Sequence, residues 1–295
     1  MNILITGAAG FIGFNFSKNL LKQNKNIKVV GIDNISSYYS IKLKKERIKY
    51  LNKNKNFKFY KLDLKNKNYL EKLFKKFKFA EVYNFAAQAG VRYSSINPDA
   101  YMETNVNGFN NLLSISRITK VKKFIYASSS SVYGDTNKYP IKESQKPDPK
   151  NLYGMTKKYN EELAEFYYQN FGFPSIGLRF FTVFGEWGRP DMFIFKLLNA
   201  SYKNKTFNLN NNGNHFRDFT YIDDVIEIIT KLRNKRNRLH KIYNICSNKP
   251  IGLKKIIQFY KSEIPRVKIE LKPKLKEDIY KTKESNKKIL KIIKK

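Results

Sequence analysis

Short apolar runs alternate with longer segments of helical spacing through the first 180 residues of the chain. In the longer segments, apolar residues recur every three to four positions, as they do on one face of a helix. This alternation indicates βαβ units, which right-handed crossovers assemble into a doubly wound parallel α/β sheet. The predicted strands are residues 3–6, 28–32, 57–62, 81–85, 123–127 and 175–179, and the predicted helices are residues 11–23, 69–77, 100–118 and 151–171.

Beyond Phe180 the pattern loosens, because Gly185, Gly188, Pro190 and an asparagine-rich turn at 210–214 interrupt short elements. Such residues mark turns and loops. We therefore expect residues 1–180 to form the main domain and residues 181–295 to form a smaller C-terminal α/β lobe. A last helix is predicted over 287–295, where four apolar residues recur at near-helical spacing. The total length of 295 residues fits this division.

The charge balance is strongly basic, with 58 Lys and Arg against 24 Asp and Glu and a formal net charge of +34. Such a charge first suggests a polyanionic partner. The lysines, however, are spread along the whole chain among asparagine and isoleucine, as a bias toward AT-rich codons would produce. No nucleic-acid-binding module is recognisable, so we interpret the charge as solvated faces and expect no nucleic-acid partner.

Few side chains in this sequence suit metal or thiol chemistry. One cysteine, Cys246, excludes an internal disulfide and a thiolate-rich zinc site, and the two histidines, His215 and His240, make a Ser-His-Asp triad a poor hypothesis. We predict no metal site. The apolar run at residues 2–5 is too short for a secretion signal, and no run of about 18 apolar residues exists to span a membrane. We expect a cytoplasmic protein without a membrane partner.

A glycine motif follows the first predicted strand and opens the first helix: Gly7, Gly10 and Gly13 have the spacing Gly-x-x-Gly-x-x-Gly. Glycines here allow a tight turn and let the backbone approach a pyrophosphate at the helix N-terminus. Asp33, twenty residues after Gly13 at the end of the second strand, would accept hydrogen bonds from a ribose and repel a 2′-phosphate. The pattern predicts an NAD site; the alternative is a glycine-rich turn in an unrelated α/β fold.

A tyrosine and a lysine four residues apart, Tyr153 and Lys157, share one face of a predicted helix. A nearby cation stabilises a phenolate, which makes Tyr153 a candidate general base. Upstream, the serines at 128–131 end the fifth predicted strand and offer a hydroxyl for a reacting alcohol. A lone Tyr-x-x-x-Lys pair is most often a chance surface pair, but its place after a dinucleotide motif favours a catalytic role.

In these motifs and their order, the sequence resembles the extended short-chain dehydrogenase/reductases with a Rossmann-like fold, in particular nucleotide-sugar epimerases. The resemblance implies that Ser129 is the catalytic hydroxyl, Tyr153 the base, and Lys157 the group that holds the nicotinamide ribose. With the glycine motif, it implies NAD-binding roles for Gly7, Gly10, Phe11, Ile12, Gly13, Asp33, Asn34, Asp63, Leu64, Phe85, Ala86, Ala87, Asn105, Ser128, Tyr153 and Lys157. Asn105 would also support the site's architecture, and Asp63 has the alternative of a helix cap.

Two segments, residues 86–94 and 179–192, resemble the UDP-glucuronate 4-epimerases more closely. Thr182 stands where UDP-galactose 4-epimerases tend to carry asparagine. The resemblance and the chemistry of carboxylate and diphosphate binding imply substrate contacts for Arg92, Ser129, Ser130, Thr182, Arg189 and Arg217. Ser130 and Ser131 replace the acidic residues of related dehydratases and decarboxylases, which favours epimerisation over elimination.

The resulting hypothesis is NAD-dependent 4-epimerisation of a UDP-sugar, namely of UDP-glucuronate to UDP-galacturonate through a 4-keto intermediate. The product UDP-galacturonate would feed polysaccharide synthesis. The alternatives are a neutral UDP-hexose or UDP-N-acetylhexosamine 4-epimerase, and a non-catalytic protein that binds NAD or nucleic acid. Residues 1–180 would bind the dinucleotide and residues 181–295 mainly the nucleotide sugar. Residues 276–279 match the family's diphosphate turn only loosely, so the lobe is expected to be shortened. Relatives suggest a homodimer through residues 100–118 and 151–171.

Overall fold

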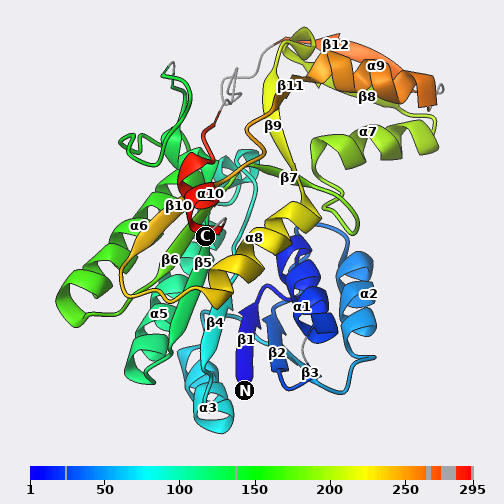
Figure 1. The fold of residues 1–295 in the computed structure, drawn as a ribbon. Coiled ribbons are helices and arrows are strands. Elements are labelled where there is room, and N and C mark those ends of the chain that lie inside the picture. Colours follow the sequence, from blue (N-terminus) through cyan, green and yellow to red (C-terminus); the bar gives the residue numbers. More distant parts are fainter. Residues whose placement is uncertain (24, 137, 264–266, 274–283, 294–295) are drawn as a thin grey trace.

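A seven-stranded parallel sheet forms the centre of the molecule in the computed structural model, which describes residues 1–23, 25–136, 138–263, 267–273 and 284–293 (Figure 1). The strand order is β10-β6-β5-β4-β1-β2-β3, and every neighbouring pair is parallel. This is the doubly wound α/β topology that the sequence predicted. The strands are β1 (Asn2–Thr6), β2 (Lys28–Asp33), β3 (Phe57–Lys61), β4 (Glu81–Asn84), β5 (Lys123–Ser129), β6 (Ile176–Phe180) and β10 (Lys241–Ile245).

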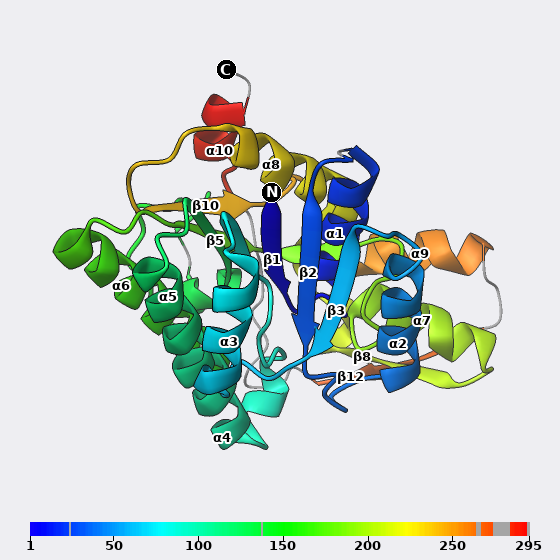
Figure 2. The same cartoon turned by 90° about the horizontal axis from the view of Figure 1, so that it is seen from below.

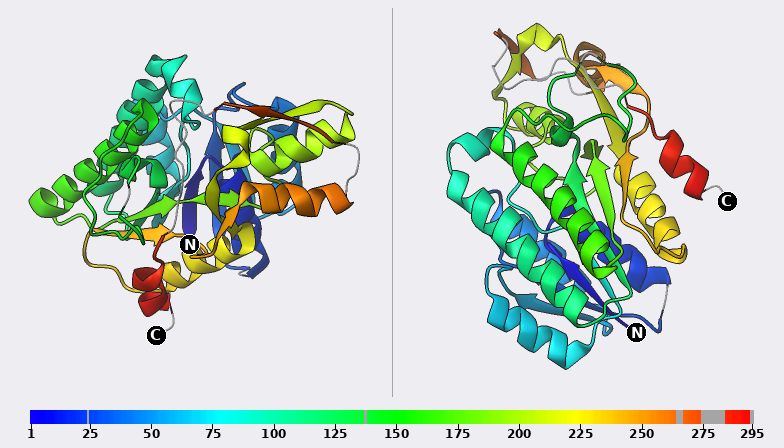
Figure 3. Two further views of the ribbon diagram at one scale, coloured as in Figure 1. Left: turned by 90° about the horizontal axis from the view of Figure 1, so that it is seen from above. Right: turned by 90° about the vertical axis from the view of Figure 1, so that its left-hand side faces the viewer.

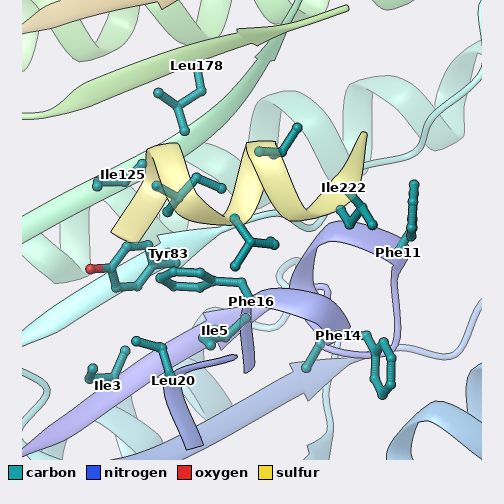
Figure 4. Packing of buried hydrophobic residues seen from close by; sticks show 14 of the residues in the cluster. Ile3, Ile5, Phe11, Phe14, Phe16, Leu20, Tyr83, Ile125, Leu178 and Ile222 are labelled. Carbon is teal, nitrogen blue, oxygen red and sulfur yellow. The ribbon is translucent and has the colours of Figure 1, made fainter. Parts of the chain in front are cut away.

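Helices cover both faces of this sheet (Figure 2). One face carries α1 (Phe11–Gln23), α2 (Ile41–Leu51), α8 (Ile222–Asn234) and α10 (Lys287–Ile293), and the other carries α3 (Lys67–Phe77), α5 (Phe109–Ile118) and α6 (Leu152–Phe171). Each face has its own apolar core. On the first, Phe16 of α1 packs against Tyr83 of β4 with ring centroids 4.6 Å apart (Figure 4). Burial of these aromatic rings stabilises the stack of helix on sheet.

The predicted helix over residues 100–118 is continuous but not uniform. It consists of α4 (Pro98–Tyr101), a π-helical segment η2 (Met102–Gly108) and α5. The Asn160 side chain donates to the Asn105 backbone carbonyl at 2.6 Å, which gives that carbonyl a partner within the widened turn. π-Helical turns often mark functional sites, and η2 lies beside the candidate site described below.

The smaller lobe lies beyond the carboxyl ends of the central strands (Figure 1). Its two strands β8 (Thr206–Asn210) and β12 (Lys268–Lys272) pair in parallel, and α7 (Phe193–Tyr202), η4 (Asn211–Gly213) and α9 (Leu253–Glu263) flank them. A second sheet joins the lobe to the main domain through β7 (Thr182–Phe184), β9 (Phe216–Tyr221) and β11 (Pro250–Gly252).

Residues after 180 are not confined to the lobe. The chain returns to the main domain for α8, β10 and α10, and the fully buried Ile289 anchors α10 beside α8 (Figure 3). A boundary at residue 180 therefore does not separate the main domain from the lobe cleanly. The assignment of residues 1–180 and 181–295 to different ligands stays a prediction. Residues 276–279, which were compared with a diphosphate-binding turn, lie outside the described residues.

Within the described part of the chain, no helix is long and apolar enough to cross a bilayer. The same residues hold no cluster of three or more His, Cys, Asp or Glu side chains arranged for a metal ion.

Candidate active site

A cavity of ≈ 1080 Å³ opens at the carboxyl ends of the central strands, between the sheet and the lobe. This is where parallel α/β sheets bind ligands, and the volume suits a dinucleotide together with a second ligand. Most of the predicted residues line it: Gly7, Gly10, Phe11, Ile12, Asp33, Asn34, Asp63, Leu64, Phe85, Ala86, Ala87, Arg92, Ser128, Ser129, Ser130, Tyr153, Lys157, Thr182, Arg189 and Arg217. Gly13 and Asn105 lie behind its wall.

The glycine motif forms a turn that no larger residue fits. Gly7 has φ +67°, and a Cβ there would lie 2.7 Å from the Ala86 nitrogen on the neighbouring strand end. A Cβ on Gly13 would collide with the Gly7 carbonyl, so Gly13 lets α1 pack directly on the turn instead of contacting a ligand. The turn and the N-terminus of α1 thus form a cradle suited to a pyrophosphate.

Asp33 lies at the end of β2 with both carboxylate oxygens facing backbone donors. Oδ2 accepts from the Ala9 nitrogen at 3.1 Å, and Oδ1 accepts from the Ile35 nitrogen at 2.8 Å. Burial raises the pKa of Asp33, and the two N–H donors and the Lys44 and Arg47 cations offset only part of this effect. Each carboxylate oxygen keeps a further lone pair for a ribose hydroxyl.

Asp63 forms the neighbouring part of the wall. Its Oδ2 accepts from the Asn34 side chain at 2.9 Å, and its Oδ1 accepts from the Lys65 nitrogen at 3.0 Å. It is not the cap of α3, because Asn66 fills that position and accepts from the Tyr69 nitrogen at 3.1 Å. Asp63 and Asn34 therefore brace each other at the cavity rim.

Two elements bring the three proposed catalytic residues together. Ser129 ends β5, while Tyr153 and Lys157 lie in the first two turns of α6, whose N-cap Asn151 accepts from the Gly154 nitrogen at 2.8 Å. The Lys157 ammonium donates to the Ala127 carbonyl of β5 at 2.8 Å. The hydroxyl–phenol–ammonium arrangement that the sequence suggested is thus formed at one wall of the cavity.

Burial and a few neighbouring side chains set the pKa values of Tyr153 and Lys157. Burial raises the pKa of Tyr153, whereas its hydrogen bond with Ser129 and the Arg189 charge lower it. Burial outweighs both, so the pKa of Tyr153 is raised overall, whereas the sequence predicted that Lys157 would lower it. Burial also lowers the pKa of Lys157 to about 8, against the opposing effect of the Glu161 carboxylate.

A buried ion pair lies behind the catalytic wall, and sequence reasoning did not find it. Glu161, one turn after Lys157 on α6, accepts from Arg179 Nε at 2.8 Å and Nη2 at 2.6 Å. The Ser128 hydroxyl donates to the same carboxylate at 2.5 Å. Ser128 therefore lines the cavity with its hydroxyl directed to Glu161. The sequence signal that could have indicated Glu161 was its position four residues after Lys157, on the same face of the predicted helix.

Asn105, in η2, is 2% exposed and holds two parts of the site in register. Its Oδ1 accepts from the Gln88 nitrogen at 2.8 Å, and its Nδ2 donates to the Gln88 carbonyl at 3.0 Å and to the Thr156 hydroxyl at 3.1 Å. It thus fixes the segment after β4 to the helix of Tyr153 and Lys157. The role of Asn105 in supporting the site's architecture stays a prediction, and its position behind the cavity wall gives no support to a direct cofactor contact.

Four of the six expected substrate residues come from four different elements. Arg92 lies in η1 (Arg92–Ser95), Ser130 in η3 (Ser130–Tyr133), Thr182 in β7 and Arg217 in β9, and all four line the cavity. Arg217 Nη1 donates to the Phe216 carbonyl at 2.9 Å.

Arg189 has a partner that the sequence did not suggest. Its Nε donates to Asp191 Oδ1 at 3.0 Å, its Nη2 donates to Oδ2, and the Tyr38 hydroxyl donates to Oδ2 at 3.3 Å. The pairing raises the pKa of Arg189 and lowers that of Asp191 in spite of burial. Tyr38 belongs to the loop between β2 and α2, so this contact joins two regions far apart in sequence.

Comparison with known proteins places these features in a family. Residues 3–246 match the NAD dependent epimerase/dehydratase family. The chain is 42% identical over 282 residues to Protein CapI of Staphylococcus aureus, covering 90% of this chain and 84% of that protein. It is 38% identical over 257 residues to UDP-glucuronate 4-epimerase of Thermodesulfobacterium geofontis, and the match covers 86% of this chain and 78% of that protein. A crystal structure of UDP-glucuronic acid 4-epimerase from Bacillus cereus with UDP-glucuronic acid and NAD matches with TM-score 0.94 and 32% identity. The match covers 100% of this chain and 93% of that one.

Proposed function

The chain belongs to the NAD dependent epimerase/dehydratase family, and from this membership we propose that it converts UDP-glucuronate to UDP-galacturonate by epimerisation at C4. The observation that carries the proposal is the meeting of Ser129, Tyr153 and Lys157 at one cavity wall, with Thr182 and Arg189 lining the same cavity. A general base beside a redox cofactor suits oxidation of an alcohol. A cation and a hydroxyl suit a sugar carboxylate.

The residues present fit NAD. The Gly7 turn leaves a cradle that a Cβ would fill, and the Asp33 carboxylate retains lone pairs for ribose hydroxyls. Lys157, fully buried beside the cavity, would hold the nicotinamide ribose. When bound, NAD supplies the chemistry of accepting the C4 hydride of the sugar and returning it to the opposite face.

Tyr153 and Ser129 are the residues we assign to transfer of the sugar's C4-hydroxyl proton. We assign Tyr153 the removal of the C4-hydroxyl proton, with Ser129 hydrogen-bonded to the same phenol and able to orient the sugar hydroxyl. Oxidation gives a 4-keto sugar, and Tyr153 then returns the proton to the new C4 oxygen. For the configuration to invert, the sugar ring must present its other face while its diphosphate stays held, a role we assign to Arg217.

The carboxylate of the sugar needs its own donors for a chemical reason. A 4-keto uronate is a β-keto acid and loses carbon dioxide readily, so a fixed carboxylate protects the intermediate. Ser130, Thr182 and Arg189 are the donors we assign to it. In the described part of the chain, the acidic residues that line the cavity are Asp33, Asp63 and Asp191, and each is already hydrogen-bonded. Elimination would need a free acid and base beside C5 and C6.

The assembly that suits this function is a homodimer. Helices α5 and α6 lie side by side and face the viewer in the right panel of Figure 3. Large apolar side chains on them are exposed, namely Ile118 at 62%, Met155 at 56% and Phe166 at 50%. Such a surface is typical of a contact between protein chains, and a second copy of the same two helices would form a four-helix interface.

Three finer assignments belong to the proposal. Residues 1–180 bind NAD, and residues 181–295 mainly bind the nucleotide sugar. The reaction takes place in the cytoplasm, where nucleotide sugars are made and used. The UDP-galacturonate that it yields enters polysaccharide synthesis.

The test is to incubate the purified protein separately with UDP-glucuronate, UDP-glucose and UDP-N-acetylglucosamine and to read the products by NMR. We expect UDP-galacturonate from the first and little conversion of the others. Conversion of only a neutral sugar would support the alternative 4-epimerase activities. No conversion, together with salt-dependent retention on nucleic acid, would support a non-catalytic protein.

A further inference from the structure

Arg47 of α2 is a fully buried guanidinium whose hydrogen-bond partners are all uncharged. Its Nη1 donates to the Ala9 carbonyl at 2.7 Å and to the Tyr39 hydroxyl at 2.8 Å. Its Nη2 donates to the Trp187 carbonyl and, at 3.2 Å, to the Gly188 carbonyl. No carboxylate of the described residues lies within ion-pair distance of it. The Asp33 charge acts on Arg47 only from a greater distance. A buried charge without a directly bonded ionic partner is costly, so these contacts point to a specific role.

The partners of Arg47 belong to three separate segments of the cavity wall. Ala9 lies in the glycine turn, Tyr39 lies in the loop before α2, and Trp187 and Gly188 lie in the turn between β7 and α7. The last contact spans 140 residues of sequence. One side chain therefore holds the proposed pyrophosphate turn and the turn that precedes Arg189.

The Trp187 turn needs such support, because its backbone is strained. Trp187 has φ +60°, a left-handed conformation that a bulky residue rarely adopts. Its ring packs on Phe14 at 5.0 Å and on Tyr50 at 6.2 Å between centroids, and its carbonyl accepts from Arg47. Ring packing fixes the side chain, and the guanidinium fixes the direction of the carbonyl. Together they determine how the chain continues to Arg189.

We propose that Arg47 is a positioning residue for substrate recognition: it holds the Trp187–Gly188 turn so that Arg189 is presented to the carboxylate of the bound sugar. The inference rests on the proposed function for the identity of that carboxylate. Arg47 does not line the cavity, so it acts through the backbone of the turn. Because the same guanidinium bonds the glycine turn, the cofactor-binding and carboxylate-binding parts of the cavity share one anchor.

The experiment uses two readouts, of which the first needs no substrate. Trp187 is the single tryptophan of the chain, so fluorescence excited at wavelengths that tyrosine does not absorb reports on this turn alone. The variants are Arg47→Met, Arg47→Lys and, as a matched control, Arg233→Met. Arg233 is a partly buried arginine that pairs with Glu81 at 2.8 Å at the amino end of β4, and neither residue lines the cavity. The second readout is the ratio of the dissociation constants for UDP-glucuronate and UDP, measured by calorimetry.

We expect Arg47→Met to red-shift the Trp187 emission, to raise its quenching by acrylamide, and to reduce the preference for UDP-glucuronate over UDP about tenfold. Arg47→Lys keeps the charge but replaces the planar guanidinium with a single ammonium, so it should show smaller changes in the same direction. It replaces Arg47→Met in the test if that variant does not fold. Arg233→Met should lower the melting temperature and leave both readouts unchanged. Unchanged emission and ratio in both Arg47 variants, or equal changes in Arg233→Met, would overturn the proposal. If the wild-type protein itself shows no preference for UDP-glucuronate, the proposed function fails, while the emission still tests Arg47.

Discussion

Arg189 and Asp191 form a two-point ion pair at the cavity wall, with the guanidinium Nε donating to Oδ1 at 3.0 Å and Nη2 donating to Oδ2. A guanidinium carries five N–H donors, so this pair can hold the plane of Arg189 in place and still leave donors for a second carboxylate. Asp191 is thereby a candidate for orienting Arg189, and its own charge is already balanced when an anionic sugar arrives.

Arg189→Met should weaken binding of UDP-glucuronate roughly 10- to 100-fold, because a hydrogen bond to a charged group contributes about 1.5–3 kcal/mol. Binding of UDP, which has no uronate, should change little. Arg233→Met is the control, because the Arg233–Glu81 pair does not line the cavity and its loss should leave both affinities unchanged. Calorimetry with both ligands measures the effect. Equal losses for UDP-glucuronate and UDP in Arg189→Met would argue against a carboxylate contact.

Tyr153→Phe should lower kcat by about 10² or more, because a positioned general base contributes at least that much. The fold and NAD content should persist, since the ring and its packing remain. Tyr159→Phe on the exposed side of the same helix is the matched control, with Tyr159 41% exposed. NMR turnover assays provide the measurement. Near-wild-type turnover in Tyr153→Phe would remove the phenol from the mechanism.

The pH dependence of activity should reflect Lys157. Burial lowers its pKa to about 8, so the ammonium is present below pH 8 and is lost above it. We expect kcat/KM to decline as the pH rises past about 8. Lys158→Arg, a change at the neighbouring and more exposed lysine, should leave that decline in place. A profile that stays flat up to pH 10 would contradict a role for the Lys157 charge.

The same pKa shift predicts a sign for stability. Between pH 8 and the ordinary lysine value of 10.5, the unfolded chain binds the proton and the folded chain does not. The contribution of Lys157 to the free energy of unfolding therefore increases with pH in this window. The melting temperature of the wild-type protein relative to Lys157→Met should increase between pH 8 and 10.

The homodimer can be tested on the exposed face of α5 and α6. Phe166→Lys places a charge in the proposed interface, and burying an unpaired charge there is costly. Tyr202→Lys, at an 89% exposed position on α7 of the lobe, is the control. Sedimentation should give a dimer for the wild-type protein and the control, and a monomer for Phe166→Lys. A wild-type monomer at micromolar concentration would contradict the assembly.

The parts of the site that the sequence predicted are those that depend on short spacing. The glycine turn, Asp33 at a strand end, and Tyr153 with Lys157 on one helix face each lie within a single element or turn. Their positions relative to one another then follow from the parallel sheet, because its strands end at one edge. Local pattern and topology together were enough for this half of the site.

The parts that were missed depend on contacts between distant segments. Helix α2 was not predicted, since six of its eleven residues are charged and they interrupt its apolar positions. Arg47 and Tyr38 therefore had no assigned place, and their contacts with Trp187 and Asp191 span about 140 and 153 residues. The π-helical turn at Asn105 likewise involves a side chain from another helix, Asn160. No periodicity in one segment encodes such pairs.

The excess positive charge should act on the rate of substrate capture. UDP-glucuronate carries the diphosphate charges and a carboxylate, and a chain with a net charge of +34 attracts such an anion over a distance limited by salt screening. We expect kcat/KM for UDP-glucuronate to fall between about 10 and 300 mM salt, where the screening length shortens from about 30 Å to below 10 Å, while kcat stays constant. Uncharged crowding agents at matched viscosity are the control for slowed diffusion. A salt effect on kcat of the same size would place the charges in the chemical step or in product release, and no salt effect on either parameter would leave the lysines as solvated surface.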